Sequence, residues 1–305
     1  MVGTKGILFY VHFNKYNKVD DYVVYQLQQM KPIFDKVVLI SNSKVAVDGK
    51  EKLNGLYDKF IQRKNTGFDF AAWRDGMSEF GWDKLSKYDE LTIMNDTCFG
   101  PVFSIRPIYE KFEKNKDVDF WGGTIRKFEK HGMPIDGGSI PEHIQSYFMV
   151  FKKPVIESPA FQNFWKNVKD YKDVKEVIQS YETQLTGILN KAGYKYDAIC
   201  TTTTVRCADE LHLKPENMIK KRFPFIKKKA VRYTNFRKIR KMLSGSDGDV
   251  IKGIVPYNTG AKYRAMDIAS SVVSPVVNMI RKTPFLYKIA IVIVRPIKKI
   301  RRKTK

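Results

Sequence analysis

Cysteine and long apolar runs are scarce in this chain. Its 305 residues include three cysteines, Cys98, Cys200 and Cys207, an odd number without the spacing of a metal site. This usage fits a reducing compartment better than a disulfide-bonded scaffold. No run approaches the roughly 18 uninterrupted apolar residues of a membrane-spanning helix, and the first residues lack the apolar core and cleavage site of a secretory leader. We therefore expect a cytoplasmic protein without a spanning helix.

Acidic residues are scarce in the C-terminal third. Residues 1–213 contain 30 Lys and Arg against 28 Asp and Glu, whereas residues 214–305 contain 25 against four. The net charge of +23 therefore belongs almost entirely to the end of the chain. Such an asymmetry indicates an anionic partner, either nucleic acid or acidic lipid.

The last distinctive segment favours lipid. An apolar run at residues 285–294 is too short to span a bilayer and is followed by seven Lys and Arg within residues 295–305. A peripheral anchor has this composition, and each cation near an anionic surface contributes about 1 kcal/mol. A solvated tail and a nucleic-acid-binding region are the alternatives, but the chain has no helix-turn-helix, RRM or zinc-finger pattern. We expect residues 236–305 to form a basic, amphipathic helical region on the inner face of the cell membrane, with no nucleic-acid partner.

Apolar runs typical of strands alternate with helical spacing along the rest of the chain. Strands are expected at residues 6–13, 36–41, 57–62, 90–94, 119–123 and 194–199, with an added antiparallel strand at 145–151. Helices are expected at residues 23–34, 68–80, 108–114, 160–168 and 181–192. Alternation of this kind predicts an α/β domain with a mostly parallel central sheet, which we assign to residues 1–235.

Two polar segments follow strands within this domain. Asn65, Thr66 and Gly67 precede a helix, where a glycine allows close backbone approach to a ligand and the free N–H groups attract phosphate. A simple helix cap is the competing interpretation of this turn. About one βα unit later, a buried strand ends in Asn95 and Asp96. A phosphate-friendly loop followed by an acid at a strand end suggests a nucleotide site.

The chain resembles the rhamnan synthesis F family of bacterial polysaccharide glycosyltransferases in five stretches that occur in order. They are NTGFDFAAW (65–73), MNDTCFGP (94–101), HIQSYF (143–148), YETQLTG (181–187) and RFPFIKK (222–228). The resemblance implies a GT-A-like nucleotide-binding α/β sandwich that transfers a sugar from a nucleotide-sugar donor. It further implies rhamnose from its dTDP form as the sugar, and a growing or lipid-linked cell-surface glycan as the acceptor.

The resemblance also implies a site for the leaving diphosphate. GT-A enzymes usually hold this group through a metal on an Asp-x-Asp motif, but here the motif reads Asn95-Asp96-Thr97 and only Asp96 is a carboxylate. A Mg²⁺ or Mn²⁺ ion can bind through one carboxylate together with substrate phosphates and water. Asp96 is therefore the expected metal or diphosphate contact, with a structural Asx turn as the competing interpretation. The missing second aspartate also leaves open a catalytically inactive, sugar-binding relative.

Glu182 is the expected catalytic base. The sequence Tyr181-Glu-Thr-Gln-Leu185 resembles the Glu-Asp-x-x-Leu helix start of family-two glycosyltransferases, with Glu182 where the catalytic aspartate would stand. A carboxylate facing the acceptor suits single-displacement chemistry with inversion. The alternative is that Glu182 only stabilises the dipole of a helix that begins there.

The remaining expected contacts surround the donor. Asn65 and Asp69 are expected to touch its base, ribose or phosphates. His143 and Gln145 precede a strand at the edge of the site, where they would hydrogen-bond sugar hydroxyls. Arg74 either pairs with a phosphate or is an ordinary surface arginine.

Overall fold

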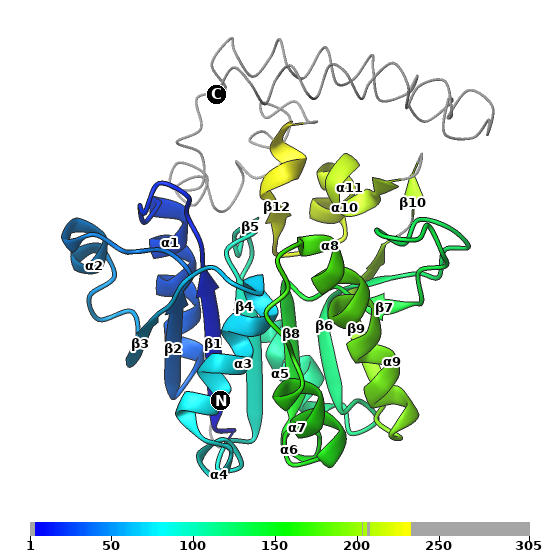
Figure 1. The fold of residues 1–305 in the computed structure, drawn as a ribbon, viewed down its shortest axis with the longest axis horizontal. Coiled ribbons are helices and arrows are strands. Elements are labelled where there is room, and N and C mark those ends of the chain that lie inside the picture. The colour runs from blue at the N-terminus through cyan, green and yellow to red at the C-terminus, as the bar shows by residue number, and fades with distance from the viewer. Residues whose placement is uncertain (1–3, 203, 206–207, 233–305) are drawn as a thin grey trace. The chain divides into compact units, whose positions relative to one another are not determined.

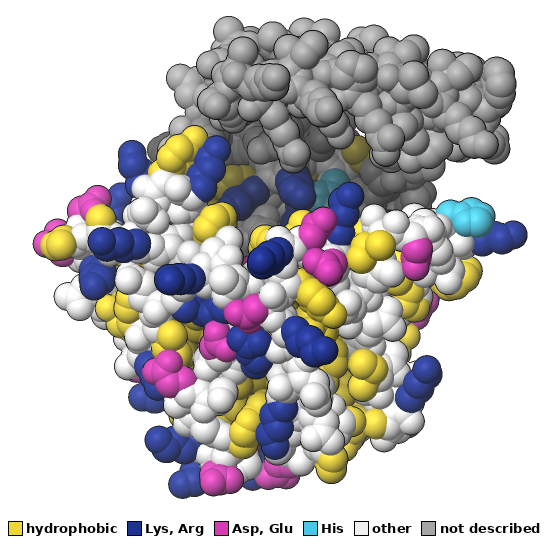
Figure 2. All heavy atoms as spheres, in the orientation of Figure 1, with side chains coloured by type: hydrophobic (Ala, Val, Ile, Leu, Met, Phe, Trp, Pro, Cys, Tyr) yellow, Lys and Arg dark blue, Asp and Glu magenta, His cyan; other side chains and the backbone are white. Residues whose placement is uncertain are grey.

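The computed structural model describes residues 4–202, 204–205 and 208–232 (Figure 1). The basic region at residues 236–305, and with it the predicted membrane anchor, lies outside the described residues, so the boundary at residue 235 stays a prediction. Within the described part, no helix is long and apolar enough to cross a membrane. On the face drawn in Figure 2, acidic and basic side chains are interspersed over the described residues. This agrees with the nearly balanced charge of residues 1–213.

An eight-stranded sheet forms the centre of the domain. Its strands follow the order β3-β2-β1-β4-β8-β6, and β7 and β9 both pair with β6. The strands are β1 (Gly6–His12), β2 (Lys36–Ser41), β3 (Lys59–Gln62), β4 (Glu90–Asn95), β6 (Phe120–Arg126), β7 (His143–Ile144), β8 (Phe148–Lys152) and β9 (Tyr196–Thr202). The pairs β1–β2, β1–β4, β2–β3 and β6–β9 are parallel, whereas β8 runs antiparallel to β4 and β6. The expected α/β fold with a mostly parallel sheet and an added antiparallel strand is confirmed.

Helices cover both faces of the sheet. One face carries α1 (Asp21–Met30), α5 (Arg106–Lys114) and α11 (Pro215–Lys220). The other, nearer face in Figure 1 carries α3 (Phe68–Phe80), α6 (Lys153–Ile156), α7 (Pro159–Lys166) and α9 (Thr183–Lys191). The strand β1 faces both layers, because Leu8 and Tyr10 pack in the first core and Ile7 and Phe9 in the second. This double burial explains why the strand is a continuous apolar run.

The remaining elements are short. They are α2 (Val47–Lys52), α4 (Trp82–Leu85), α8 (Val174–Val177), α10 (Glu210–Leu213), 3₁₀ turns at Lys31–Ile33 and Lys228–Arg232, and the ladders of β5 (Cys98–Phe99) with β12 (Ile226–Lys227) and β10 (Thr204–Val205) with β11 (Ala208–Asp209).

Residues 174–191 differ from the sequence prediction, in which a helix begins at residue 181. Helix α8 begins earlier, because Asp173 Oδ1 accepts from Lys175 N at 2.9 Å and Glu176 Oε2 accepts from Asp173 N at 3.3 Å. A π-helical turn at Ile178–Glu182 then joins α8 to α9. The predicted helix start is therefore wrong. Glu182 lies inside a continuous helical segment, where it does not meet the free N–H groups of a helix N-terminus.

The strand order reverses beside β1. The chain passes from β1 through α1 to β2 and β3 on one side, and α3 then returns it to β4 on the other side of β1. Val11 of β1 and Asn95 of β4 are paired near the carboxyl ends of these strands. Open α/β sheets bind ligands outside the carboxyl ends of the strands at such a switch point. The fold thus marks the surroundings of Asn95 as the place for a site.

Candidate functional site

Asn95 and Asp69 are joined at the carboxyl edge of β4. Asn95 Nδ2 donates to Asp69 Oδ2 at 2.7 Å, and Asn95 Oδ1 accepts from the Thr97 N and Oγ1 atoms at 3.1 and 2.6 Å. The contact between Asn95 Oδ1 and the Thr97 amide is an Asx turn. An Asx turn is the competing interpretation of Asp96, but the side chain that makes this turn is Asn95. The Asp96 carboxylate makes other contacts.

Asp69 is held in an environment that favours its protonated form. It lies in the first turn of α3. Its pKa is raised from 3.8 to about 7, first by burial and then by the nearby charge of Asp96, while the hydrogen bond from Asn95 and the charge of Lys227 lower it. A carboxyl group with this pKa is partly protonated at neutral pH, so it can both donate and accept a hydrogen bond.

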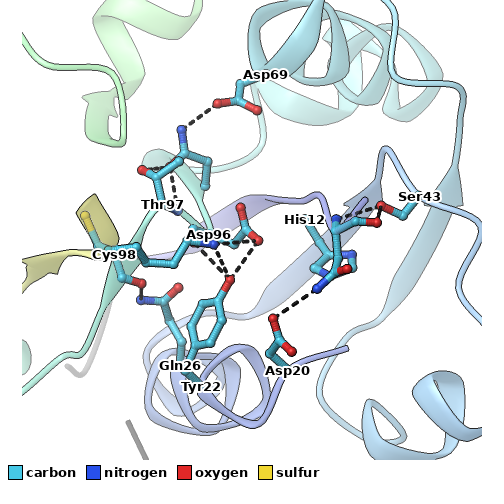
Figure 3. A network of polar contacts seen from close by, with 12 residues as sticks. His12, Asp20, Tyr22, Gln26, Ser43, Asp69, Asp96, Thr97 and Cys98 are labelled. Carbon is cyan, nitrogen blue, oxygen red and sulfur yellow. Dashed lines mark hydrogen bonds and ion pairs between the residues drawn. The ribbon is translucent and has the colours of Figure 1, made fainter. Parts of the chain in front are cut away.

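Asp96 follows β4 directly and is 5% exposed. Its backbone N–H donates to Val11 O at 3.1 Å, which ties it to the end of β1. Its Oδ2 atom accepts from Tyr22 Oη at 3.0 Å, and Figure 3 shows this tyrosine reaching Asp96 from α1. Burial and the Asp96 charge raise the pKa of Tyr22 well above its ordinary value, so Tyr22 remains a hydroxyl donor.

Lys228 is the second partner of the Asp96 carboxylate. Its Nζ atom lies 3.4 Å from Asp96 Oδ2 and also donates to Tyr22 Oη. The backbone delivers it there, because Lys228 N donates to Thr97 O at 3.0 Å next to the ladder between β12 and β5. Lys228 ends the last of the five family stretches, but no role was predicted for it, and a two-residue strand has no periodicity by which this pairing could have been found.

Lys227, in β12, lies near the same strand end as Asp96 and Thr97. Its Nζ atom donates to Thr97 Oγ1 at 2.9 Å and lies 3.8 Å from the centroid of the Tyr147 ring. Its positive charge also affects His212, whose pKa is lowered to about 4 by burial first and then by Lys227, Lys229 and Arg126. Cations therefore dominate the surroundings of this histidine.

Glu182 is the last residue of the π-helical turn. Ser146, between β7 and β8, donates its hydroxyl to Glu182 Oε2. The charge of Glu182 contributes to the raised pKa of Asp69, so the two carboxyl groups share one electrostatic environment. π-Helical turns within helices are frequent at functional sites.

His143 and Gln145 have partners within the chain. His143 is 1% exposed, and its Nδ1 atom lies 2.7 Å from Pro141 O. Gln145 is 7% exposed, and its Oε1 atom accepts from Thr124 Oγ1 at 2.6 Å. Gln145 directly precedes Ser146, the residue that holds Glu182. Their expected contacts with sugar hydroxyls stay predictions.

The start of α3 packs against residues 168–171 of the same chain. Gly67 is in the left-handed region, with a φ of 64°, and its N–H donates to Tyr171 O at 3.2 Å. A Cβ atom on Gly67 would lie 3.0 Å from Asp170 Cα. Arg74 fastens the same segment by donating to Val168 O at 2.6 Å and Asp170 Oδ1 at 2.8 Å. Gly67 therefore packs closely against residues 170–171, and Arg74 anchors this segment. The expected approach of Gly67 to a phosphate stays a prediction.

The structure thus brings together part of the predicted site. Asp69, Asn95 and Asp96 meet at one strand end, and Glu182 acts electrostatically on Asp69. Asn65 is exposed on the loop before α3. Within the described residues, no group of three or more His, Cys, Asp or Glu side chains is arranged to hold a metal ion.

Comparison with known proteins gives a family match. The family model described as rhamnan synthesis protein F matches residues 37–249. An uncharacterized protein of Sinorhizobium fredii, y4gN, is 28% identical over 161 residues, which cover 52% of this chain and 39% of that protein. The chain spans about two fifths of the length of the curated relatives that it matches.

The similar solved structures are distant. A putative nucleotide-diphospho-sugar transferase from Desulfovibrio desulfuricans is 13% identical with a TM-score of 0.41, covering 79% of this chain and 96% of that one. Glucosyl-3-phosphoglycerate synthase from Mycobacterium tuberculosis, in complex with Mn²⁺, UDP and its product, is 8% identical with a TM-score of 0.30, covering 50% and 58%.

Proposed function

The chain belongs to the rhamnan synthesis protein F family, and we propose that it is a glycosyltransferase that uses a nucleotide-sugar donor. The observation that carries the proposal is the meeting of Asp69, Asn95 and Asp96 outside the carboxyl end of β4, at the switch point of the sheet. In its finer form the proposal names rhamnose from dTDP-rhamnose as the sugar, and a lipid-linked or growing cell-surface polysaccharide as the acceptor.

The donor lies along the carboxyl ends of β1 and β4 in this proposal. Asp69 contacts the nucleoside, since a partly protonated carboxyl can both donate to and accept from a base or ribose. Asp96 lies beneath the diphosphate, beside the Lys228 ammonium group. Buried, hydrogen-bonded groups need little rearrangement as charge develops, which favours the transition state.

Glu182 acts as the general base. Its carboxylate takes the proton of the acceptor hydroxyl while that oxygen attacks the anomeric carbon from the side opposite the diphosphate. The bond between the anomeric carbon and the diphosphate oxygen breaks, and the nucleoside diphosphate leaves with the electron pair. Inversion at the anomeric carbon follows from this single displacement. The hydrogen bond from Ser146 orients the carboxylate for the proton transfer.

The donor set at Asp96 does not fit a divalent cation well. Asp96 is the single carboxylate of the Asn95-Asp96-Thr97 segment, and its Oδ2 atom already has the Tyr22 hydroxyl at 3.0 Å and the Lys228 ammonium at 3.4 Å. The nearby Asp69 Oδ2 atom accepts from Asn95 Nδ2. The Asn95 side-chain oxygen is occupied by two contacts with Thr97. A divalent cation at this carboxylate would face the positive charge of Lys228. We therefore assign no step to a metal.

Membrane association belongs to residues 236–305 in this proposal. A lipid-linked acceptor would sit at an anionic surface, which suits an apolar run followed by cations. Removal of residues 284–305 should shift the protein from the membrane fraction to the soluble fraction and leave donor binding intact. An unchanged distribution would contradict the anchor.

Transfer assays with Asp96→Ala test the enzymatic proposal. The assay follows release of nucleoside diphosphate from dTDP-rhamnose and from UDP- and GDP-sugars, with a membrane extract as the source of acceptor. We expect turnover by the wild type and its loss in the variant. Asp83→Ala is the matched control, because Asp83 is exposed in α4 at the opposite end of the sheet. Equal turnover in wild type and Asp96→Ala would contradict the assignment of the site.

A further inference from the structure

We propose that Lys227 and Lys228 bind the diphosphate of the donor and neutralise it as it leaves, so that transfer proceeds without a divalent cation. The inference rests on the proposed function. It assigns to two lysines the neutralisation of the diphosphate that a metal on an Asp-x-Asp motif usually provides. It follows from the poor fit of a cation at Asp96, together with the geometry that brings two ammonium groups to the same strand end.

The two lysines are delivered by backbone pairing. Ile226 pairs with Phe99 and Lys227 with Cys98, in the antiparallel ladder of β12 with β5. A further hydrogen bond of 3.0 Å runs from Lys228 N to Thr97 O. Strand β5 begins two residues after Asp96. Its pairing with β12 therefore fixes the positions of both lysine Cα atoms relative to the Asp96 carboxylate. Charges fixed in advance of the reaction are the ones that favour a charged transition state.

Both ammonium groups keep donors for a ligand. An ammonium group has three N–H donors. Lys228 contacts the Tyr22 hydroxyl and ring and the Asp96 carboxylate, and Lys227 contacts the Thr97 hydroxyl and the face of the Tyr147 ring. The Lys228 side chain is 32% exposed, whereas the Asp96 side chain beneath it is 8% exposed. Lys228 therefore lies between a buried carboxylate and the solvent from which a diphosphate arrives.

The charges around the site suit an anion. Lys227 lies next to Lys228, and the charges of Lys227, Lys229 and Arg126 all act on His212. If Lys228 served only as the ion-pair partner of Asp96, one lysine would be enough. Lys227 adds a second positive charge, which Asp96 does not neutralise. The diphosphate of a nucleotide sugar carries two negative charges, and it gains a third as the sugar departs. Two adjacent lysines meet this demand as point charges.

Titration calorimetry of the full chain with dTDP and UDP, in EDTA and in MnCl₂, tests the inference. We expect one nucleotide to bind in EDTA, with little change on addition of Mn²⁺. Lys227→Met and Lys228→Met should each weaken binding about tenfold or more, because each removes a charge-assisted hydrogen bond. Lys228→Arg keeps the charge and should retain most of the affinity. Lys84→Met is the control, since Lys84 is exposed in α4, at the end of the sheet away from β12.

The outcomes separate this inference from the proposed function. Binding that requires Mn²⁺ and is unchanged in Lys227→Met and Lys228→Met would overturn the role of the lysines and leave the glycosyltransferase standing. Absence of binding by either nucleotide in both buffers would overturn the proposed function, and the inference with it. The thermal unfolding midpoint of each variant shows whether a loss of affinity comes from unfolding. If Lys228→Met is unfolded, Lys228→Arg is compared with the wild type instead.

Discussion

Asn95 Nδ2 donates to Asp69 Oδ2 at 2.7 Å, although the two residues are 26 positions apart in the sequence. The bond ties the first turn of α3 to the carboxyl end of β4. It joins two of the five stretches that carry the family resemblance, one around Asp69 and one around Asn95. The proposed donor site is built on this junction.

The raised pKa of Asp69 gives a pH-dependent stability. Its pKa rises from 3.8 to about 7 in the folded protein. Between these values the folded state holds a proton that the unfolded state has lost, so the free energy of unfolding decreases as pH rises through this window. Asp69→Asn removes this dependence and keeps an acceptor for Asn95. In urea unfolding, its stability gain over the wild type should grow from about pH 4 to pH 7, and then level off.

Glu90→Gln is the matched control for Asp69→Asn. Burial raises the pKa of Glu90 from 4.5 to about 7, and Glu90 begins β4 at the end opposite Asn95. Its substitution should give the same pH-dependent gain with unchanged dTDP binding, whereas Asp69→Asn should weaken dTDP binding about tenfold. A stability gain of Asp69→Asn that is independent of pH would contradict the raised pKa.

Glu182→Gln separates catalysis from binding. Loss of a general base typically lowers the rate by about 10²–10⁴-fold. We expect kcat for sugar transfer to fall within this range while the Kd for dTDP stays within about twofold. Glu157→Gln, an exposed glutamate after α6, should leave both unchanged. A variant that keeps wild-type kcat would remove Glu182 from the mechanism.

Arg74→Met tests the anchoring role found for this arginine. The substitution removes hydrogen bonds to Val168 O and Asp170 Oδ1. The free energy of unfolding should fall by about 1–3 kcal/mol, measured with urea. The Kd for dTDP should not change, because the Arg74 guanidinium group contacts residues 168–170 of the protein and not the nucleotide. Weaker dTDP binding with unchanged stability would restore the phosphate-binding interpretation.

Gly67→Ala tests why a glycine precedes α3. The added Cβ would lie 2.5 Å from Ala71 Cβ and 3.0 Å from Asp170 Cα, on a residue whose φ is +64°. The left-handed conformation alone costs a side-chain-bearing residue about 1–2 kcal/mol. We expect a loss of at least this size in urea unfolding. Wild-type stability would show that residues 170–171 move away easily and that Gly67 is free to face a ligand.

Local patterns were enough to predict the sheet and α3. The apolar run of β1 and the acid that follows β4 each lie within a few residues of sequence. Because parallel strands end at one edge of the sheet, Asp96 could be expected near the start of α3 and its Asp69. The contact between Asn95 and Asp69 follows from that topology.

The rest of the site depends on contacts between distant segments. Lys227 and Lys228 reach Asp96 through a two-residue ladder, which is too short for a periodic signal. The position of Glu182 depends on a cap at Asp173, which begins the helix earlier than the apolar spacing indicates. Gly67 has the sequence of a phosphate loop, but the space in front of it is taken by residues 170–171.

Thermal unfolding of the full chain with a panel of nucleotide sugars tests the central claim most directly. A donor at a hundred times its dissociation constant stabilises the folded form by about 2.7 kcal/mol. With dTDP-rhamnose and the corresponding UDP- and GDP-sugars, we predict that one donor raises the unfolding midpoint of the wild type in EDTA. The same donor should raise the midpoint of Lys228→Met less, because this variant lacks one of the two ammonium groups proposed to hold the diphosphate. No shift with any of these donors, in EDTA or in Mn²⁺, would contradict a nucleotide-sugar site at the carboxyl end of β4.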